Sequence, residues 1–580
     1  MELSLQKGSR SRILAGLLLL AIAIFIGRLF YLQIIQHDEY VKLAAAEQIK
    51  PLTIPAQRGE IYALDGNAPV PLVQNQPIYT LFADPAVVTE PDRVLTVVRE
   101  VAGGNLRPKI DELLERKNTR YQILGTKLSR KQAELIKKEN LSGIGFQEVS
   151  QRVYPEGKLA AQTLGFVNDE GVGQYGVESA LNDRLVGHDG LLKSVTDVSG
   201  VPLTIGDRNI NEPAKNGDNI VLTIDRNIQS YVERTLASKV KSLGADTGSV
   251  IVMNPQNGDI MAMANFPTFN PEKFNSVKNS ALFNNNVISR PYEPGSVMKT
   301  FAMAIGLDKG VIQPNSTYIN TDSIKVEDRV IQNLWRGETG KITMQTGLNY
   351  SLNTSVVTVA QLLGDGKNVD RKARDTIYSY LYDKFHLGQI TGVELAGEQP
   401  GVIIPPTEVE GNAVRYSNMT FGQGMNLTML QVAAGFCSLI NGGTYHPPTV
   451  IAGTLSDGGI FTGAEEKGSQ ENVISPSSAK KIHSMIRKAR KAFYAGNDIP
   501  GYDIGGKTGT SQTLKPEGGY NDDETIATYL GYGGNSTPKY VIMVETSGKD
   551  KYLEGNKHAL PIFTDISNWL IEYLRIDPKG

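Results

Sequence analysis

Three separated segments of the chain carry residue types that could share one piece of chemistry. The first begins at Glu293 and reads EPGSVMK. Its Pro-Gly pair interrupts the chain, and the apolar pattern that follows predicts a helix from Ser296 to about residue 310. Residues three apart share a helix face, so Lys299 would lie one turn from the Ser296 hydroxyl. A serine becomes a nucleophile when a base takes its proton, and burial can lower the pKa of a lysine enough for that task.

The second segment is Ser351-Leu352-Asn353, which precedes the apolar run 356–363. A second hydroxyl and an amide there could relay a proton and bind a peptide group. Neither segment is specific alone. A serine three residues before a lysine occurs by chance about twice in a chain of this length, and it is otherwise a helix cap beside a surface lysine. Ser-x-Asn is usually a helix cap as well.

The third segment, residues 505–512, reads GGKTGTSQ and allows two interpretations. Residues 501–508 match the phosphate-binding loop G-x-x-x-x-G-K-[ST] letter for letter, but that loop must follow a buried strand and open a helix. The preceding AGNDIP is not strand-like, and a glycine and a proline soon after disfavour a helix, so no nucleotide is expected. The favoured interpretation is an edge strand whose glycines let a peptide backbone lie close. Three side chains would then face a substrate carboxylate: Lys507, Thr508 and Thr510.

The order of the three segments is more specific than any one of them. Ser296, Ser351 and Lys507 follow one another at gaps of about 55 and 155 residues. The signature of penicillin-binding proteins and class A β-lactamases consists of S-x-x-K, then S-D-N, then K-T-G. This chain resembles that signature, except that Leu352 takes the place of Asp in the second motif. The chain length and the large N-terminal region favour a penicillin-binding protein over a β-lactamase.

The resemblance extends over nearly the whole chain to the class B penicillin-binding proteins. It rests on residues 58–66 (RGEIYALDG), 152–155 (RVYP), 173–178 (GQYGVE), 223–225 (TID), and 421–424 (FGQG) with Thr428 and Gln431. The EPG before Ser296 and the FG at 421 are more similar to the division branch than to the elongation branch, which remains the alternative. The segment before the catalytic region has no glycosyltransferase-like motif, so a bifunctional class A enzyme is not expected.

The resemblance implies a peptidoglycan D,D-transpeptidase of septal wall synthesis that β-lactams inhibit. Ser296 would attack the carbonyl between two terminal D-Ala residues, and an amine of a neighbouring stem peptide would resolve the acyl-enzyme. The implied catalytic residues are Ser296, Lys299, Ser351, Asn353 and Lys507, the implied substrate-binding residues are Thr508, Gly509 and Thr510, and the backbone N–H groups of Ser296 and Thr510 would form the oxyanion hole. A non-catalytic β-lactam-binding receptor or division scaffold is the alternative from another class.

The N-terminal region contains the longest apolar stretch of the sequence. Residues 13–27 carry no charge, and the apolar character resumes after Arg28 as far as Ile35. A helix over 13–35 would span about 34 Å, enough for a bilayer. The basic residues before it predict that residues 1–12 lie in the bacterial cytoplasm and that the catalytic region lies outside the membrane. A cleaved signal peptide is the alternative, but the run is longer than such a peptide and no small-residue cleavage site follows it.

The segments between these landmarks predict the fold. We expect a transmembrane helix at 13–35, an α+β membrane-proximal pedestal or dimerisation domain at 37–210, and an α/β penicillin-binding transpeptidase domain at 211–580. The expected strands are 219–224, 248–253, 260–264, one near Lys507 and 540–545, and the expected helices are 129–139, 226–243 and 562–574. This order predicts a mainly antiparallel sheet with helices on its faces and a helical subdomain.

The composition argues against several other classes of function. The 59 basic and 61 acidic residues nearly cancel to a net charge of −2, so no nucleic-acid partner is expected. The single cysteine, Cys437, lies in an apolar run and is expected in the core, and the six scattered histidines offer no metal site, so neither metal nor cofactor is expected. The resemblance implies four partners: stem peptides of lipid-linked nascent glycan, the membrane, a multi-span glycosyltransferase of the shape, elongation, division and sporulation (SEDS) family, and other division proteins.

Overall fold

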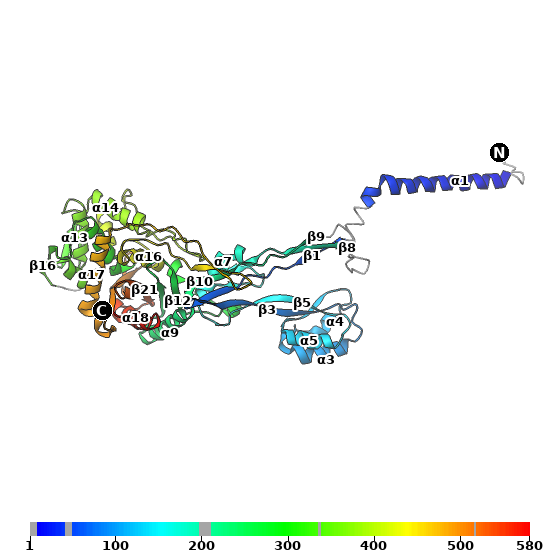
Figure 1. The fold of residues 1–580 in the computed structure, drawn as a ribbon, viewed down its shortest axis with the longest axis horizontal. Coiled ribbons are helices and arrows are strands. Elements are labelled where there is room, and N and C mark those ends of the chain that lie inside the picture. The colour runs from blue at the N-terminus through cyan, green and yellow to red at the C-terminus, as the bar shows by residue number, and fades with distance from the viewer. Residues whose placement is uncertain (1–8, 41–48, 196–209, 335–337, 516–517, 580) are drawn as a thin grey trace. The chain divides into compact units, whose positions relative to one another are not determined.

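A computed structural model of the 580-residue chain describes residues 9–40, 49–195, 210–334, 338–515 and 518–579 (Figure 1). The chain divides into two compact units, one of residues 1–58 with 186–217 and the other of residues 59–185 with 218–580. The expected domain limits at 37–210 and 211–580 stay a prediction.

The first unit contains an apolar helix and a small sheet. Helix α1 (Ser9–Phe30) continues as the π-helical turn η1 (Tyr31–Ile35), and Ser11–Ile35 has a mean hydropathy of 2.6. Its large apolar side chains are exposed, as expected of a segment long and apolar enough to cross a membrane. Three antiparallel strands form the sheet in the order β1-β8-β9: β1 (Ile49–Ile54), β8 (Gly190–Val195) and β9 (Ile210–Glu212).

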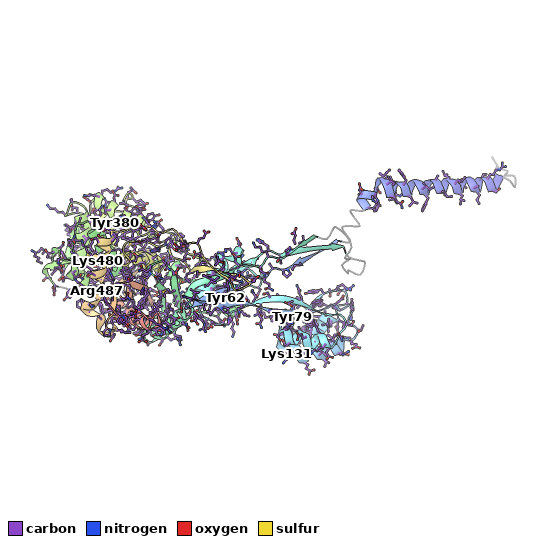
Figure 2. All side chains as sticks on the ribbon, in the orientation of Figure 1. Tyr62, Tyr79, Lys131, Tyr380, Lys480 and Arg487 are labelled. Carbon is purple, nitrogen blue, oxygen red and sulfur yellow. The ribbon has the colours of Figure 1, made fainter. Side chains whose placement is uncertain are left out.

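A seven-stranded sheet forms one part of the second unit, in the order β18-β17-β10-β2-β3-β4, with β5 also paired to β3. Strand β10 runs parallel to β2 and antiparallel to β17. Tyr79 of β3 donates to Glu148 of β5 (2.9 Å), and Figure 2 labels this tyrosine. The strands are β2 (Ile61–Asp65), β3 (Ala68–Ala83), β4 (Gln122–Leu128), β5 (Ile144–Val153), β10 (Asn219–Asp225), β17 (Ile451–Leu455) and β18 (Phe461–Gly463).

Short helices accompany this sheet. The helices α3 (Pro91–Ala102), α4 (Ile110–Leu114) and α5 (Arg130–Lys138) share a core with β3 and β4. Ser129 and Gln132 form a capping box at the start of α5, which explains why the helix expected at 129–139 begins there. The remaining elements of this region are α6 (Ala161–Leu164), β6 (Phe166–Val167), β7 (Gly173–Gln174), α7 (Gly176–Ala180) and α8 (Asn182–Val186).

A five-stranded antiparallel sheet carries the third motif at its edge. Its order is β12-β11-β21-β20-β19, formed by β11 (Thr247–Met253), β12 (Ile260–Phe266), β19 (Asp503–Leu514), β20 (Tyr520–Gly534) and β21 (Pro538–Ser547). Helices α9 (Arg226–Ser242) and α18 (Leu560–Tyr573) pack beside it (Figure 1), where Val232 and Phe563 are fully buried. Helices α16 (Met429–Ile440) and α17 (Pro476–Phe493) also pack on this sheet, against β21 and β19 respectively.

A helical subdomain lies between β12 and β19 in the sequence. Its helices and turns are η3 (Pro271–Ser276), η4 (Ser280–Phe283), α10 (Asn286–Ser289), η5 (Gly295–Met298), α11 (Lys299–Asp308), α12 (Met344–Asn349), α13 (Asn353–Leu363), α14 (Arg371–Tyr378), η6 (Ser379–Lys384), α15 (Ala413–Met419), α16 (Met429–Ile440), α17 (Pro476–Phe493) and η7 (Ala495–Asn497). Two small antiparallel sheets of two strands each interrupt it: β13 (Thr317–Asn320) with β16 (Gly340–Thr343), and the hairpin of β14 (Ser323–Val326) with β15 (Arg329–Gln332). Cys437 of α16 is buried in the core, as expected.

The expected fold class is confirmed, with three differences in detail. The strand expected at 219–224 forms as β10 but joins the seven-stranded sheet, because its partners β2 and β17 are far away in the sequence. Strand β20 was not expected, because its first residues (YNDDE) are polar and glycines interrupt its buried end. The helix expected from Ser296 begins instead as the 3-10 turn η5 and becomes α-helical at Lys299.

Candidate active site

Ser296 lies in the turn η5, which leads directly into α11. Gly295 has a φ of +67°, and a Cβ on it would lie 2.9 Å from Thr510 O on β19. Its N–H donates to Gly422 O (3.1 Å), and a Cβ on Gly422 would overlap Gly295 O. Glycine at both positions therefore lets three backbone segments meet beside the serine.

Lys299 is the first residue of α11, and its side chain is almost fully buried. Its Nζ donates to Ser351 O and, at 3.2 Å, to Ser351 Oγ. Burial holds the pKa of Lys299 well below that of lysine in water, and the nearby charge of Lys507 lowers this pKa further. The amine therefore gives up its proton readily, which is the property that a general base needs.

The second motif lies between α12 and α13. Ser351 has a φ of +59°, a left-handed conformation that places its hydroxyl and its carbonyl oxygen next to the Lys299 amine. Asn353 begins α13, and its Nδ2 donates to Gln332 O (2.8 Å) on β15. The structure thus joins Ser351 to Lys299, whereas the Asn353 amide is turned toward a neighbouring strand.

The third motif forms the middle of edge strand β19, so the interpretation as an edge strand is confirmed and the helix of a phosphate-binding loop is absent from residues 503–514. Lys507 is 5% exposed, and its Nζ donates to Thr508 O (3.0 Å) and Thr508 Oγ1 (3.2 Å). Burial lowers the pKa of Lys507 to about 7. A Cβ on Gly509 would lie 2.9 Å from Pro294 O, so β19 packs directly on the turn that holds Ser296.

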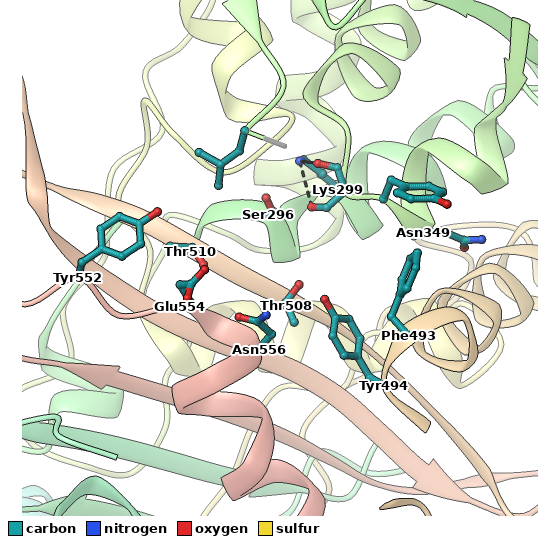
Figure 3. Close-up of a pocket in the computed structure, with 13 residues that line it drawn as sticks. Ser296, Lys299, Asn349, Phe493, Tyr494, Thr508, Thr510, Tyr552, Glu554 and Asn556 are labelled. Atoms are coloured by element: carbon teal, nitrogen blue, oxygen red, sulfur yellow. Dashed lines mark hydrogen bonds between the residues drawn. The ribbon is translucent and has the colours of Figure 1, made fainter. Parts of the chain in front are cut away.

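A cavity of about 340 Å³ joins the three motifs (Figure 3). Five of the site residues expected from the sequence line it: Ser296, Lys299, Ser351, Thr508 and Thr510. Asn353, Lys507 and Gly509 stand next to these residues in the chain but do not line the cavity. Lys507 nevertheless contacts the cavity lining, because its Nζ donates to Thr508 Oγ1 (3.2 Å).

Sequence reasoning missed the other residues that line the cavity. They come from four places: the segment after β15, the two residues before Ser351, the end of α17 with the residue after it, and the segment between β21 and α18. Proximity to Ser351 could have indicated Asn349 and Tyr350, but the others are brought in by the fold alone. The missed residues are Leu334, Asn349, Tyr350, Phe493, Tyr494, Tyr552, Glu554 and Asn556.

Glu293 links the first motif to two other segments. It is 7% exposed, and its Oε1 accepts hydrogen bonds from Gly424 N (2.7 Å) and Tyr520 Oη (3.1 Å). Burial raises the pKa of this carboxyl group. The EPG and FGQG segments, each of which resembles a family motif, are therefore in contact through Glu293.

Two segments that precede β10 in the chain also meet. Arg152 (RVYP) and Glu178 (GQYGVE) form a buried ion pair at 2.8 Å. Removing one partner would leave an uncompensated buried charge, so the two segments depend on each other.

Comparison with known proteins gives two family matches. Residues 248–568 match the model "Penicillin binding protein transpeptidase domain", and residues 53–222 match "Penicillin-binding Protein dimerisation domain". The first match alone covers more than half of the chain. The chain belongs to the penicillin-binding transpeptidases. The resemblance to class B penicillin-binding proteins is thereby confirmed.

Named relatives match this penicillin-binding transpeptidase at similar levels. The chain is 30% identical over 440 residues to penicillin-binding protein PbpB of Mycolicibacterium smegmatis, with 74% of this chain and 66% of PbpB covered. It is 28% identical over 588 residues to peptidoglycan D,D-transpeptidase FtsI of Escherichia coli K12, with 98% and 93% covered. It is also 28% identical over 563 residues to stage V sporulation protein D of Bacillus subtilis, with 95% and 84% covered.

Solved structures of penicillin-binding proteins share the fold. Penicillin binding protein 3 of Mycobacterium tuberculosis in its apo form has 25% identity and a TM-score of 0.67, with 91% of this chain and 98% of that chain covered. Penicillin Binding Protein 2X of Streptococcus thermophilus has 22% identity and a TM-score of 0.74, with 91% and 80% covered.

Proposed function

We propose that this penicillin-binding transpeptidase cross-links peptidoglycan stem peptides through an acyl-enzyme on Ser296. The observation that carries the proposal is the shared cavity, which brings Ser296 together with Lys299, Ser351, Thr508 and Thr510. These residues come from segments more than 200 positions apart in the sequence. They supply a nucleophile, a buried amine and three further hydroxyls within one cavity.

In the first half of the reaction, Ser296 Oγ attacks the carbonyl carbon between the two terminal D-Ala residues of a donor stem. Lys299 Nζ takes the hydroxyl proton, a role that its lowered pKa supports. The Lys299–Ser351 hydrogen bond offers a path for that proton to the nitrogen of the departing D-Ala. The products are the acyl-enzyme ester and free D-Ala.

The oxyanion of this step needs donors that are already in place. The backbone N–H groups of Ser296 and Thr510 are our candidates, and the close packing of Gly295 against Thr510 supports them. The hydroxyls of Thr508 and Thr510 would donate hydrogen bonds to the terminal carboxylate of the donor stem, with Lys507 behind them. A bound carboxylate would favour the charged form of Lys507 and so raise its pKa.

A covalent penicillin adduct tests the nucleophile. Ser296→Ala should abolish labelling by benzylpenicillin while the protein keeps its fold, as judged by circular dichroism and thermal melting. Ser276→Ala, at an exposed serine outside the cavity, is the matched control and should label like the parent. Intact-mass spectrometry of the treated proteins decides, and a penicillin adduct on the Ser296→Ala variant would overturn the assignment.

We further propose that the protein spans the bacterial cytoplasmic membrane once, with residues 1–12 inside and the catalytic unit outside. The exposed apolar surface of Ser11–Ile35 and the basic residues before it support this orientation. Septal wall synthesis is supported by the near full-length match to FtsI. A transpeptidase also needs new glycan strands, for which a SEDS-family glycosyltransferase is the partner that we propose.

A further inference from the structure

The described residues that line the active-site cavity include one carboxylate, that of Glu554. It lies in the loop between β21 and α18, and its side chain is 12% exposed. Lys557 lies three residues later, and its side chain is 65% exposed. The Lys557 amine forms an ion pair with Glu554 Oε2. None of the three motifs requires an acidic group in the cavity, so the role of Glu554 calls for its own explanation.

The backbone around Glu554 is fixed against the third motif. Gly555 N donates to Thr510 Oγ1 (3.1 Å), and a Cβ on Gly555 would overlap Gly509 O. The Glu554 N–H donates to His558 Nδ1 (2.9 Å) within the following turn, η8 (Gly555–Ala559). Glu554 is therefore held beside Thr510, and Figure 3 shows the two together on the far side of Ser296 from Asn349 and Phe493.

The charges around the cavity make this carboxylate useful in the second half of the reaction. Lys299 lines the cavity, where burial favours its neutral form, and Lys507 lies directly behind it with a pKa of about 7, so an incoming cation meets a partial positive charge from Lys507. A stem-peptide amine is mostly an ammonium ion near neutral pH. It would be repelled from the acyl-enzyme unless an anion attracts it, and a partly buried carboxylate binds ammonium more strongly than one in open water.

We propose that Glu554 binds the ammonium group of the acyl acceptor and so forms the acceptor subsite of the cavity. This inference rests on the proposed function, because it assumes an acyl-enzyme on Ser296. The acceptor is a primary amine carried on a second stem peptide. The negative charge of Glu554 also repels the terminal carboxylate of the donor stem. This repulsion helps to keep the donor and acceptor stems at separate positions in the cavity.

The step that Glu554 assists is aminolysis of the acyl-enzyme. The ammonium first loses one proton to solvent, and the amine nitrogen then attacks the ester carbonyl carbon. A C–N bond forms, the bond from that carbon to Ser296 Oγ breaks, and the second proton of the amine passes through Lys299 to Ser296 Oγ. The products are the cross-linking amide, free Ser296 and one proton, so Glu554 is a positioning residue that is not consumed.

The test separates the two halves of the reaction in the full-length protein in detergent. A D-alanyl thioester serves as donor, and the acyl-enzyme partitions between water and an added acceptor. Glycinamide is the cationic acceptor, and hydroxylamine, which is uncharged at neutral pH, is the neutral one. The measured quantity is the aminolysis rate constant for each acceptor, divided by the benzylpenicillin acylation rate constant of the same variant.

For Glu554→Gln, this ratio should fall by about tenfold with glycinamide and stay within about twofold with hydroxylamine, because one charge-assisted contact is lost. Glu572→Gln, at an exposed glutamate of α18, is the matched control and should leave both ratios unchanged. An equal fall for both acceptors would overturn the inference, since it would show a role in loop structure alone.

Lys557→Met provides a second test that keeps Glu554 in place. Removing the competing ammonium should raise the glycinamide ratio, and a fall would overturn the inference. Failure of the proposed function would look different. Parent protein that takes up neither thioester nor penicillin would contradict the acyl-enzyme itself, whereas normal acylation with aminolysis insensitive to charge would contradict the acceptor subsite alone.

Discussion

The Lys299 amine is both buried and hydrogen-bonded, and these two conditions act on different properties. Burial lowers its pKa, so that the neutral form is available to accept a proton. The hydrogen bonds to Ser351 fix its position, because Nζ sits at the end of a flexible side chain that would otherwise sample several rotamers. A base that is both neutral and positioned acts mainly on the transition state rather than on ligand binding.

Lys299→Ala should therefore slow benzylpenicillin acylation by about 10²–10⁴-fold while weakening initial binding far less. Stopped-flow or quenched labelling at several penicillin concentrations separates the two constants. Lys309→Ala removes an exposed lysine just after the same helix and should behave like the parent. Acylation of Lys299→Ala at the parent rate would place the base elsewhere.

A pH profile tests the coupling between the two buried lysines. The charge of Lys507 lowers the pKa of Lys299, so Lys507→Met should raise the pKa of Lys299. Lys299 acts as a base only when unprotonated, and the acylation rate falls as it gains a proton. The acid limb of the penicillin acylation profile should thus move to higher pH in the variant. Lys507 has a pKa of about 7 and is therefore charged in the acid range where the limb is measured.

The same profile distinguishes recognition from electrostatic coupling. Lys507→Met should also lower the plateau rate, because Lys507 supports the carboxylate-binding hydroxyl of Thr508. A lower plateau with the acid limb unmoved would show that Lys507 acts on the substrate alone. Lys539→Met, at an exposed lysine of β21, controls for the loss of one positive charge from the protein.

The sequence indicated the residues whose roles depend on short-range spacing and missed those that the fold brings in. Ser296 and Lys299 are three apart on one turn, so their proximity follows from local geometry. Glu554 and Phe493 belong to segments roughly 200 to 260 residues downstream, and no local pattern marks them as cavity residues. The orientation of Asn353 toward Gln332 could not be predicted either, because it depends on how β15 packs beside α13.

At the scale of elements, three backbone segments meet at Gly295: the serine turn η5, the strand β19 and the loop of the FGQG segment. Their contacts are made by backbone atoms, since Gly295 N donates to Gly422 O and Gly295 packs against Thr510. A side chain at Gly422 would push η5 away from that loop. Because η5 carries both the nucleophile and a proposed oxyanion donor, a small shift there should affect the reaction more than the fold.

Gly422→Ala should lower the penicillin acylation rate by about 100-fold, the effect expected of a displacement near 1 Å in a reacting geometry. Gly422 also has a φ of +88°, so the substitution adds backbone strain of about 1–2 kcal/mol. Gly459→Ala is the matched control, because Gly459 has a φ of +78° with no atom within 4 Å of a Cβ. It should lose similar stability in thermal melts and keep full acylation, whereas equal acylation by both variants would contradict the steric argument.

Elements with strong local patterns were predictable, and those defined by distant pairing were less so. The apolar strands β11, β12 and β21 and the amphipathic helices α9 and α18 lie within a few residues of the expected bounds. Strand β20 begins in a polar sequence and becomes a strand because β19 and β21 pair with it on both sides. The sheet to which β10 belongs depends on its pairing with β2, about 160 residues earlier, which periodicity cannot indicate.

At the scale of the whole molecule, the chemistry and the membrane segment occupy different parts of the chain. The three motifs lie within residues 296–510, all in the second compact unit, whereas α1 and η1 belong to the first. The described side chains of residues 11–35 are mostly exposed and apolar, so this helix has a surface that lipid or another membrane helix would cover. The proposed SEDS-family partner is a multi-span membrane protein, and the helix is the segment best suited to pack beside it.

A truncated chain that begins at residue 40 should therefore keep benzylpenicillin acylation at the parent rate and lose co-purification with the glycosyltransferase. A full-length variant in which an unrelated apolar helix of equal length replaces residues 13–35 separates tethering from specific packing. That variant should stay in the membrane and still lose most of the complex, because helix association in lipid depends on side-chain packing rather than on apolarity. If the exchanged helix or the truncated chain binds the glycosyltransferase as tightly as the parent does, residues 13–35 serve as a tether and the partner contacts lie in the region outside the membrane.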